Sequence, residues 1–329
     1  MKKFVTATLV SALTVSALVA PIAQASEPTI CLAYDTGGPG DSSFNDAVQA
    51  GLKVAAKKME FTLETTVTSG DAKDRIDRLT SLVKKDCAIV IAVGTGYAAT
   101  LKELSQKYPE TQFAILNDAT VDALNVTSIV FADNQGAYLA GFAAALASKT
   151  GKVAMVGYAS QKELFEKGFT PGAKAANKSI VTTIRYISSS ASAATTQLLR
   201  SGHDVIYLTT TGSATEVFGA IVASNNANRK KNPSGLITVE PDQFLSVDAA
   251  TKRFVLATVV KRVDLALIDL LTKTLEESTL FDEVDPVLGI YGKRYGISDK
   301  SIEITLRSPG LIAKTSAINA ASSAASKLN

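Results

Sequence analysis

Short apolar strands alternate with amphipathic helical segments along most of the chain, and this alternation restricts the fold more than any other feature. One set of segments runs from a strand at 30–34 to a helix at 135–149. A second set runs from a strand at 153–157 to a strand at 236–239. Such alternation is typical of parallel sheets that carry helices on both faces. We therefore expect an α/β fold with two doubly wound parallel-sheet lobes.

The composition excludes several classes of protein. The 329 residues are 46% hydrophobic and 20% charged, which are values of a folded globular chain. One His and two Cys cannot form a zinc cluster and leave little for His-dependent catalysis, so we predict no metal, no cofactor and no catalytic residues. The formal net charge of +3 gives no reason to expect nucleic acid as a partner.

The first 25 residues have the pattern of a cleaved signal peptide. A basic start at Lys2 and Lys3 precedes a mostly apolar stretch over 4–20, and Ala23-Gln24-Ala25 fits the small-x-small cleavage rule. The alternative is an uncleaved membrane anchor, which would need about 20 predominantly apolar residues. We expect an exported protein that is soluble after cleavage and is periplasmic or associated with the cell surface.

Two cysteines lie at the starts of two predicted strands. Cys31 opens the strand at 30–34, and Cys87 directly precedes the strand at 88–93. In a doubly wound sheet these two strands would be neighbours about 5 Å apart, which is within disulfide range. A disulfide and a pair of buried free thiols are both compatible with the sequence.

The glycine-containing motifs do not indicate an enzyme. The glycines at 37–40 are not followed by Gly-Lys-Ser/Thr, which excludes a P-loop, and there is no Gly-x-Ser-x-Gly. Residues 94–99 fit Gly-x-Gly-x-x-Ala, but they follow the third strand of their lobe rather than the first. A tight turn beside a ligand cleft is the favoured interpretation, because ligands of open α/β sheets bind beyond the carboxyl ends of the strands.

The segment Asp35-Thr36-Gly37-Gly38-Pro39-Gly40-Asp41-Ser42-Ser43-Phe44-Asn45 resembles the opening signature of the basic membrane protein family, the purine nucleoside receptor-like substrate-binding proteins. Further blocks agree with the family and follow in the same order; they include 131–141, 148–152, 168–174, 242–243 and 259–264. The resemblance implies a type I periplasmic binding protein fold, with a hinge and a central cleft, that serves an ABC importer. The implied partners are a nucleoside-like ligand and a membrane permease, with the protein itself a monomer.

The resemblance also implies a set of ligand-binding residues. The residues that match family ligand contacts are Asp35, Phe44, Asn45, Asn117 or Asp118, Gly212, Glu240 and Lys261. Tyr97, in the turn after the strand at 88–93, is added as a candidate because its ring could face the ligand. A Phe ring offers a flat apolar face to a base, and Asp and Asn side chains can bond its polar edge. A Lys and a Glu can bond the hydroxyls of a ribose.

Some positions depart from the family pattern. Glu240 stands where the family usually has Asp, and Gln135 where it often has Glu. The second stacking aromatic of the family is expected near Ser189 or Ser190, so one face of the aromatic sandwich is missing unless Tyr97 or Tyr158 supplies it. These departures keep open a different small polar solute, such as a sugar or a nucleobase derivative. An exported nucleoside-processing enzyme is a further alternative.

The order of the predicted segments suggests how the lobes divide the chain. We expect the first lobe to contain 26–131 and 252–280, and the second lobe to contain 132–251 and 281–316. The Ala- and Ser-rich stretch 317–329 is expected to be a flexible tail.

Overall fold

The computed structural model describes residues 27–41, 44–159, 162–188, 190–209, 214–228, 232–239, 243–277 and 284–329. The expected signal peptide, Ser189, Gly212 and Glu240 lie outside these residues. In the described part of the chain, no helix is long and apolar enough to cross a membrane.

The first lobe is built on a parallel sheet of six strands. Its central strands are apolar along their whole length, so both faces are buried beneath helices. The strand order is β11(Gly292–Tyr295), β5(Val126–Phe131), β4(Phe113–Leu116), β3(Ile89–Val93), β1(Thr29–Tyr34) and β2(Thr62–Val67). The accompanying helices are α1(Phe44–Ala55), α2(Ala72–Val83), the 3₁₀ turn η1(Thr95–Tyr97), α3(Ala98–Lys107), α10(Val263–Thr272) and the π-helical turn η3(Lys273–Glu277).

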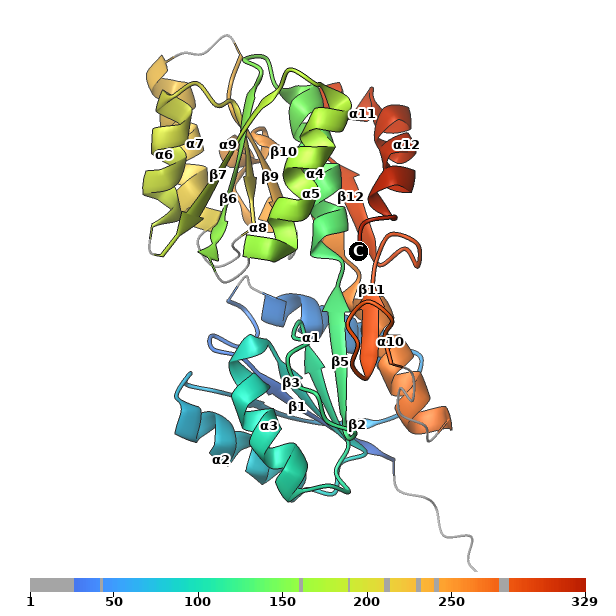
Figure 1. The fold of residues 1–329 in the computed structure, drawn as a ribbon. Coiled ribbons are helices and arrows are strands. Elements are labelled where there is room, and N and C mark those ends of the chain that lie inside the picture. The colour runs from blue at the N-terminus through green and yellow to red at the C-terminus, as the bar shows by residue number, and fades with distance from the viewer. Residues whose placement is uncertain are drawn as a thin grey trace, which may run out of the picture.

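The second lobe repeats this architecture with one antiparallel edge strand. Its sheet has the order β12(Ile302–Leu306), β10(Val255–Lys261), β9(Gly235–Val239), β8(Val205–Leu208), β6(Lys152–Tyr158) and β7(Val181–Ile187), and β12 runs antiparallel to β10. The longer helices are α4(Asp133–Ala147), α5(Lys162–Ala176), α6(Ala191–Arg200), α7(Ala214–Asn228) and α12(Thr315–Ala325). The short helices are α8(Gln243–Ser246), α9(Ala249–Lys252) and α11(Pro309–Ile312). Figure 1 shows the two lobes joined at one side. The predicted two-lobed α/β fold is confirmed.

The structure divides the chain between the lobes differently from the prediction. Strand β10 belongs to the second lobe, although 252–280 was expected in the first. Strand β11 belongs to the first lobe, although 281–316 was expected in the second. The chain therefore returns to the first lobe for α10 and β11 and then goes back to the second for β12.

The expected flexible tail is wrong, because 317–329 is largely helical. Helix α12 packs Ala321 and Ala325 against Tyr138 and Leu139 of α4, and its Ile318 is buried as well. An Ala- and Ser-rich sequence can form this helix because Ala has the highest helix propensity and its small side chain allows a close helix–helix approach.

Helices α4 and α5 lie unusually close together, and glycines make this possible. A Cβ atom on Gly168 would lie 1.8 Å from the carbonyl oxygen of Asn134, and one on Gly172 would lie 2.0 Å from that of Tyr138. On the other helix, a Cβ atom on Gly141 would lie 2.1 Å from the carbonyl oxygen of Phe169. This contact places the first turn of α4 against the second turn of α5.

The first lobe contains a disulfide between Cys31 and Cys87, whose Cα atoms lie 5.8 Å apart. As predicted, β1 and β3 are neighbouring parallel strands. The disulfide closes a loop with a sequence separation of 56 residues. It therefore restricts the unfolded chain across the entire β1–α1–β2–α2 segment.

Reduction of this disulfide is expected to lower the free energy of unfolding by about 2–4 kcal/mol, because the reduced unfolded chain has more conformations available. Urea denaturation with and without a reductant measures the difference. A variant with both Cys31→Ala and Cys87→Ala serves as the control, since its stability should not respond to reductant. Equal stability of the oxidised and reduced native sequence would contradict the expectation.

His203 is the one histidine of the chain, and it is buried between α6 and β7. Its Nε2 atom lies 2.9 Å from Oγ1 of Thr183, and Nδ1 lies 3.1 Å from the carbonyl oxygen of Leu198. Burial lowers the pKa of this imidazole, and the nearby charges of Lys152 and Arg185 lower it further.

A lowered pKa in the folded state means that the unfolded chain binds the His203 proton at a higher pH. The stabilising contribution of neutral His203 is therefore complete above about pH 6.5 and is lost as the pH falls towards the folded-state pKa. We expect the free energy of unfolding to decrease between pH 7.5 and pH 5, measured by denaturant titration. The decrease should be smaller in His203→Gln, and an identical decrease in both proteins would contradict this role.

Candidate functional site

Three crossover segments connect the lobes, and they lie side by side. They follow β5, β10 and β11 in the chain. The backbone N–H of Ala132 donates to the carbonyl of Tyr295 at 2.7 Å, and the N–H of Arg262 donates to the carbonyl of Ser301 at 2.8 Å. Hydrogen bonds thus join the first crossover to the third and the second crossover to the third. This arrangement forms a hinge at the edge of both sheets (Figure 1).

A buried ion pair lies at this hinge. Lys261 is the last residue of β10 and Asp133 is the first residue of α4, and Nζ of Lys261 lies 2.7 Å from Oδ1 of Asp133. Their side chains are only 6% and 5% exposed. Both charges have therefore lost nearly all of their water, and the opposite charge beside each one compensates for part of that loss.

Three phenylalanine rings surround the ammonium group of Lys261. The Nζ atom lies 5.9 Å from the ring centroid of Phe44, 5.8 Å from that of Phe131 and 5.9 Å from that of Phe165. Phe44 and Phe131 come from the first lobe and Phe165 comes from the second. Phe44 also packs edge-on against Phe131, with ring centroids 6.3 Å apart. Phe44 and Lys261 thus lie close together, and aromatic rings from both lobes surround the ammonium group.

The carboxylate of the predicted residue Asp35 is hydrogen-bonded to other groups of the first lobe. Oδ1 of its carboxylate accepts from Nη2 of Arg75 at 2.9 Å and from the backbone N–H of Thr36 at 2.8 Å. This carboxylate directly follows β1 at the carboxyl edge of the sheet, which is where ligands of such sheets bind. In this structure, Asp35 and Arg75 together fix the beginning of the 35–41 loop.

Asn45 also stabilises this loop. Its Oδ1 atom accepts from the backbone N–H of Asp35 at 3.2 Å, and Nδ2 lies 3.1–3.3 Å from the carbonyls of Asp35 and Thr36 and from Oδ2 of Asp41. The side chain is buried, and both ends of its amide already have partners in the loop. Asn45 therefore positions the segment that leads into α1 and the Phe44 ring.

Tyr97 does not lie at the cleft surface, so it cannot supply the missing aromatic face. It is fully buried, and its hydroxyl donates to the carbonyl of Tyr34 at 3.0 Å. Burial, followed by the charge of Asp35, raises the pKa of Tyr97 to about 12. The sequence did not reveal this role, because a core Tyr and a stacking Tyr differ only in where the hydroxyl finds its acceptor.

A cavity of about 620 Å³ opens between the lobes at the carboxyl ends of β4 and β5. Asn117 and Asp118 of the first lobe line it, together with Phe131 and Asp133 at the first crossover. Leu164 of α5 contributes the opposite wall. Oδ1 of Asp118 accepts from the backbone N–H and the hydroxyl of Thr120, both at 2.7 Å, which fixes the orientation of its carboxylate.

The second-lobe predictions are only partly described. Gly212, Glu240 and Ser189 lie outside the described residues. Ser190 is the N-cap of α6, and its side chain accepts from the backbone N–H of Ala193 at 3.2 Å. Tyr158 is 36% exposed at the end of β6.

The sequence reasoning missed several residues of the site. Asp133, Phe131 and Phe165 surround Lys261, and Arg294 lines the cleft cavity. One signal was available, because Asp133 follows a buried strand and begins a helix within the family block at 131–141. Phe165 had no comparable signal, since its place beside Lys261 depends on the close packing of α4 and α5.

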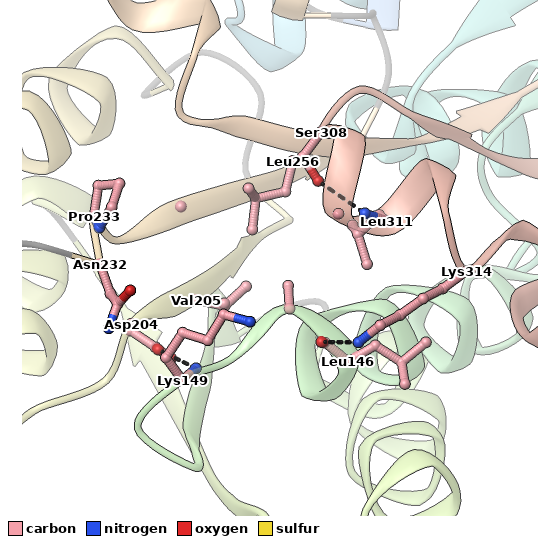
Figure 2. Close-up of a pocket in the computed structure, with 13 residues that line it drawn as sticks. Leu146, Lys149, Asp204, Val205, Asn232, Pro233, Leu256, Ser308, Leu311 and Lys314 are labelled. Atoms are coloured by element: carbon pink, nitrogen blue, oxygen red, sulfur yellow. Dashed lines mark hydrogen bonds between the residues drawn. The ribbon is translucent and has the colours of Figure 1, made fainter.

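A separate cavity of about 320 Å³ lies in the second lobe. Figure 2 shows its lining, which includes Val205, Leu256, Leu311 and the side chains of Lys149 and Lys314. It lies at the amino ends of β8, β9 and β10, whereas open α/β sheets bind ligands at the carboxyl ends. The candidate site is therefore the cleft at the hinge.

Comparison with solved structures supports the fold. The chain is similar to a transcriptional activator of the comK gene from Bacillus halodurans, with a TM-score of 0.70, 19% identity and coverage of 89% of this chain and 97% of that chain. It is also similar to an ABC transporter solute-binding protein from Aeropyrum pernix, with a TM-score of 0.67, 18% identity and coverage of 89% and 80%. At these identities the likeness concerns the fold alone.

Comparison with protein sequences identifies the family. The chain is 33% identical over 265 residues to a CD4+ T-cell-stimulating antigen of Listeria innocua, covering 75% of this chain and 73% of that protein. It is 31% identical over 255 residues to the ABC transporter nucleoside-binding protein BmpA of Lactococcus lactis, covering 73% of each. The family pattern matches residues 30–319. The chain belongs to the family of PnrA-like ABC transporter substrate-binding proteins.

Proposed function

We propose that this protein binds a nucleoside between its two lobes and delivers it, unaltered, to an ABC importer. The observation that carries the proposal is the buried Lys261–Asp133 pair beside three aromatic rings at the hinge. A relative that is named a nucleoside-binding protein supports the choice of ligand class.

The chemistry of the pair suits an uncharged solute with neighbouring hydroxyls. Lys261 and Asp133 carry opposite charges, so the pair itself presents no net charge to a ligand. The ammonium can donate to a hydroxyl oxygen and the carboxylate can accept from a hydroxyl, and the diol of a ribose offers both groups. Each such charged hydrogen bond contributes about 1.5–3 kcal/mol.

The position of the site explains how binding would close the lobes. Phe44 and Asp118 belong to the first lobe, whereas Asp133, Leu164 and Lys261 belong to the second. A ligand shifts the equilibrium towards a closed form only if it gains contacts there that the open form lacks. Contacts with both lobes provide that difference, and the hydrogen-bonded crossovers provide the axis.

Binding to a panel of ligands tests the proposal directly. We expect purine and pyrimidine nucleosides to raise the thermal unfolding midpoint and to show stoichiometric heats in calorimetry, while free ribose and arabinose do not. Chromatography of the incubated nucleosides should show no products. A response to the free sugars alone would favour a sugar-binding protein, and turnover would favour an enzyme.

Removal of both charges of the ion pair should lower the affinity for nucleosides while the protein still folds. Each single change, Lys261→Met or Asp133→Asn, removes one charge of this pair while the opposite charge stays buried, and should cost about 3–5 kcal/mol of stability. In the double variant neither charge remains, so its unfolding midpoint should exceed that of either single variant. Its affinity should still fall at least tenfold, which corresponds to about 1.4 kcal/mol.

A matched pair outside the cleft provides the control. Nζ of Lys85 lies 2.6 Å from Oε2 of Glu64 at the exposed edge of the first sheet. The double variant Glu64→Gln with Lys85→Met removes the same kinds of charge and should leave nucleoside affinity unchanged. Equal affinity of the cleft variant and the wild type would exclude the Lys261–Asp133 pair from the site.

A further inference from the structure

The residues after α12 return to the hinge. Helix α12 lies along α4, and the segment that follows it ends beside β11 at the junction of the lobes (Figure 1). Leu328 packs against the cluster that contains Tyr138 of α4, and Ile297 of the third crossover packs there as well. Residues 326–329, which we call the strap, therefore lie where the first and third crossovers meet.

Two amide side chains of α4 hold the strap. Nε2 of Gln135 donates to the carbonyl of Ser326 at 3.3 Å and to that of Leu328 at 3.0 Å. Nδ2 of Asn134 donates to the carbonyl oxygen of Asn329 at 3.0 Å. Gln135 and Asn134 are only 5% and 6% exposed, so these hydrogen bonds are formed away from water.

The same two amides also bind the other side of the hinge. Oε1 of Gln135 accepts from the backbone N–H of Ile297 at 2.8 Å, and Oδ1 of Asn134 accepts from Nη2 of Arg294 at 2.6 Å. Arg294 lies in β11 of the first lobe, and its Nη2 atom is also 3.5 Å from the carbonyl of Leu328. Each amide thus uses its nitrogen for the strap and its oxygen for the third crossover or for the first lobe.

The third crossover packs directly against this network. A Cβ atom on Gly296 would lie 2.6 Å from Oε1 of Gln135, so the crossover backbone lies directly against the amide. Asn329 also lines a small cavity of about 170 Å³, together with Phe131, Asp133 and Arg294, which are residues of the cleft cavity as well. The strap therefore adjoins both the hinge and the binding cleft.

We propose that residues 326–329 are part of the hinge and limit how far the two lobes separate. Rotation about the crossovers moves Arg294 and Ile297 relative to α4. The strap holds the side chains of Asn134 and Gln135 in the orientation in which their oxygens accept from Arg294 and Ile297. Opening of the lobes therefore requires these buried hydrogen bonds to break together. Asn134, Gln135 and Arg294 are positioning residues in this arrangement. The proposal concerns the ligand-free protein and does not depend on which solute binds.

The distance between the lobes tests the proposal without any ligand. Nitroxide labels are attached at Lys102→Cys on α3 and Gln197→Cys on α6, which are both exposed positions. Pulsed electron paramagnetic resonance then measures the distance between the lobes. The native cysteines do not take up label because they are joined in the disulfide. Deletion of Leu328 and Asn329 should shift the distance distribution to longer values and broaden it. Gln135→Glu should do the same, because it keeps the acceptor for Ile297 but loses both donors to the strap.

Asn329→Gly serves as the matched control, since it keeps all three backbone acceptors of the strap and should leave the distribution unchanged. Thermal unfolding is measured on each variant in parallel. A longer interlobe distance in both strap variants, with or without a lower unfolding midpoint, supports the proposal. An unchanged distribution in the deletion variant overturns it, even if the midpoint falls, because the strap would then only stabilise the fold.

Discussion

The ion pair between Lys261 and Asp133 is the interaction on which the site depends. Lys261 is the last residue of β10 and Asp133 is the first residue of α4, so the pair joins two of the crossovers between the lobes. A buried charge without a partner is strongly destabilising. The two crossovers therefore have to stay close to each other, and the rings of Phe44, Phe131 and Phe165 exclude water from the space around them.

The tight contact between α4 and α5 explains how a residue of α5 reaches this pair. Gly168 and Gly172 remove the side chains that would separate the helices, and Phe165, one turn before Gly168, consequently lies beside Lys261. The aromatic environment of the ammonium thus depends on backbone packing more than on any local motif. A ligand that enters the cleft meets groups whose positions are already determined by the fold.

Much of the fold could be predicted from the sequence, because buried parallel strands produce continuous apolar runs. The exceptions are elements with weak local signals. Strand β11, with the sequence Gly-Lys-Arg-Tyr, has no apolar run, and it forms a strand only because it pairs with β5, far away in the sequence. Helix α12 has small rather than large apolar residues, so its burial depends on the surface that α4 offers.

The site could be predicted in outline, and the roles of single residues could not. Phe44 and Lys261 were expected together and are together. Asn45 and Tyr97 were expected at the ligand, yet both satisfy their polar groups within the first lobe. An amide or a phenol can bond a backbone carbonyl as well as a ligand, and only the three-dimensional arrangement decides between them. For the same reason the sequence left open whether Cys31 and Cys87 form a disulfide or remain free thiols.

The late position of β11 in the chain has a consequence for how the protein reaches its native state. The first lobe cannot complete its sheet until residues 292–295 are available to pair with β5, although its other five strands lie before residue 132. The second lobe is interrupted by α10 and β11 and needs β12 at its own edge. Neither lobe is formed by one uninterrupted segment of the chain, so the two lobes have to fold together, and a chain cut before β11 would leave β5 as an unpaired edge of the first sheet.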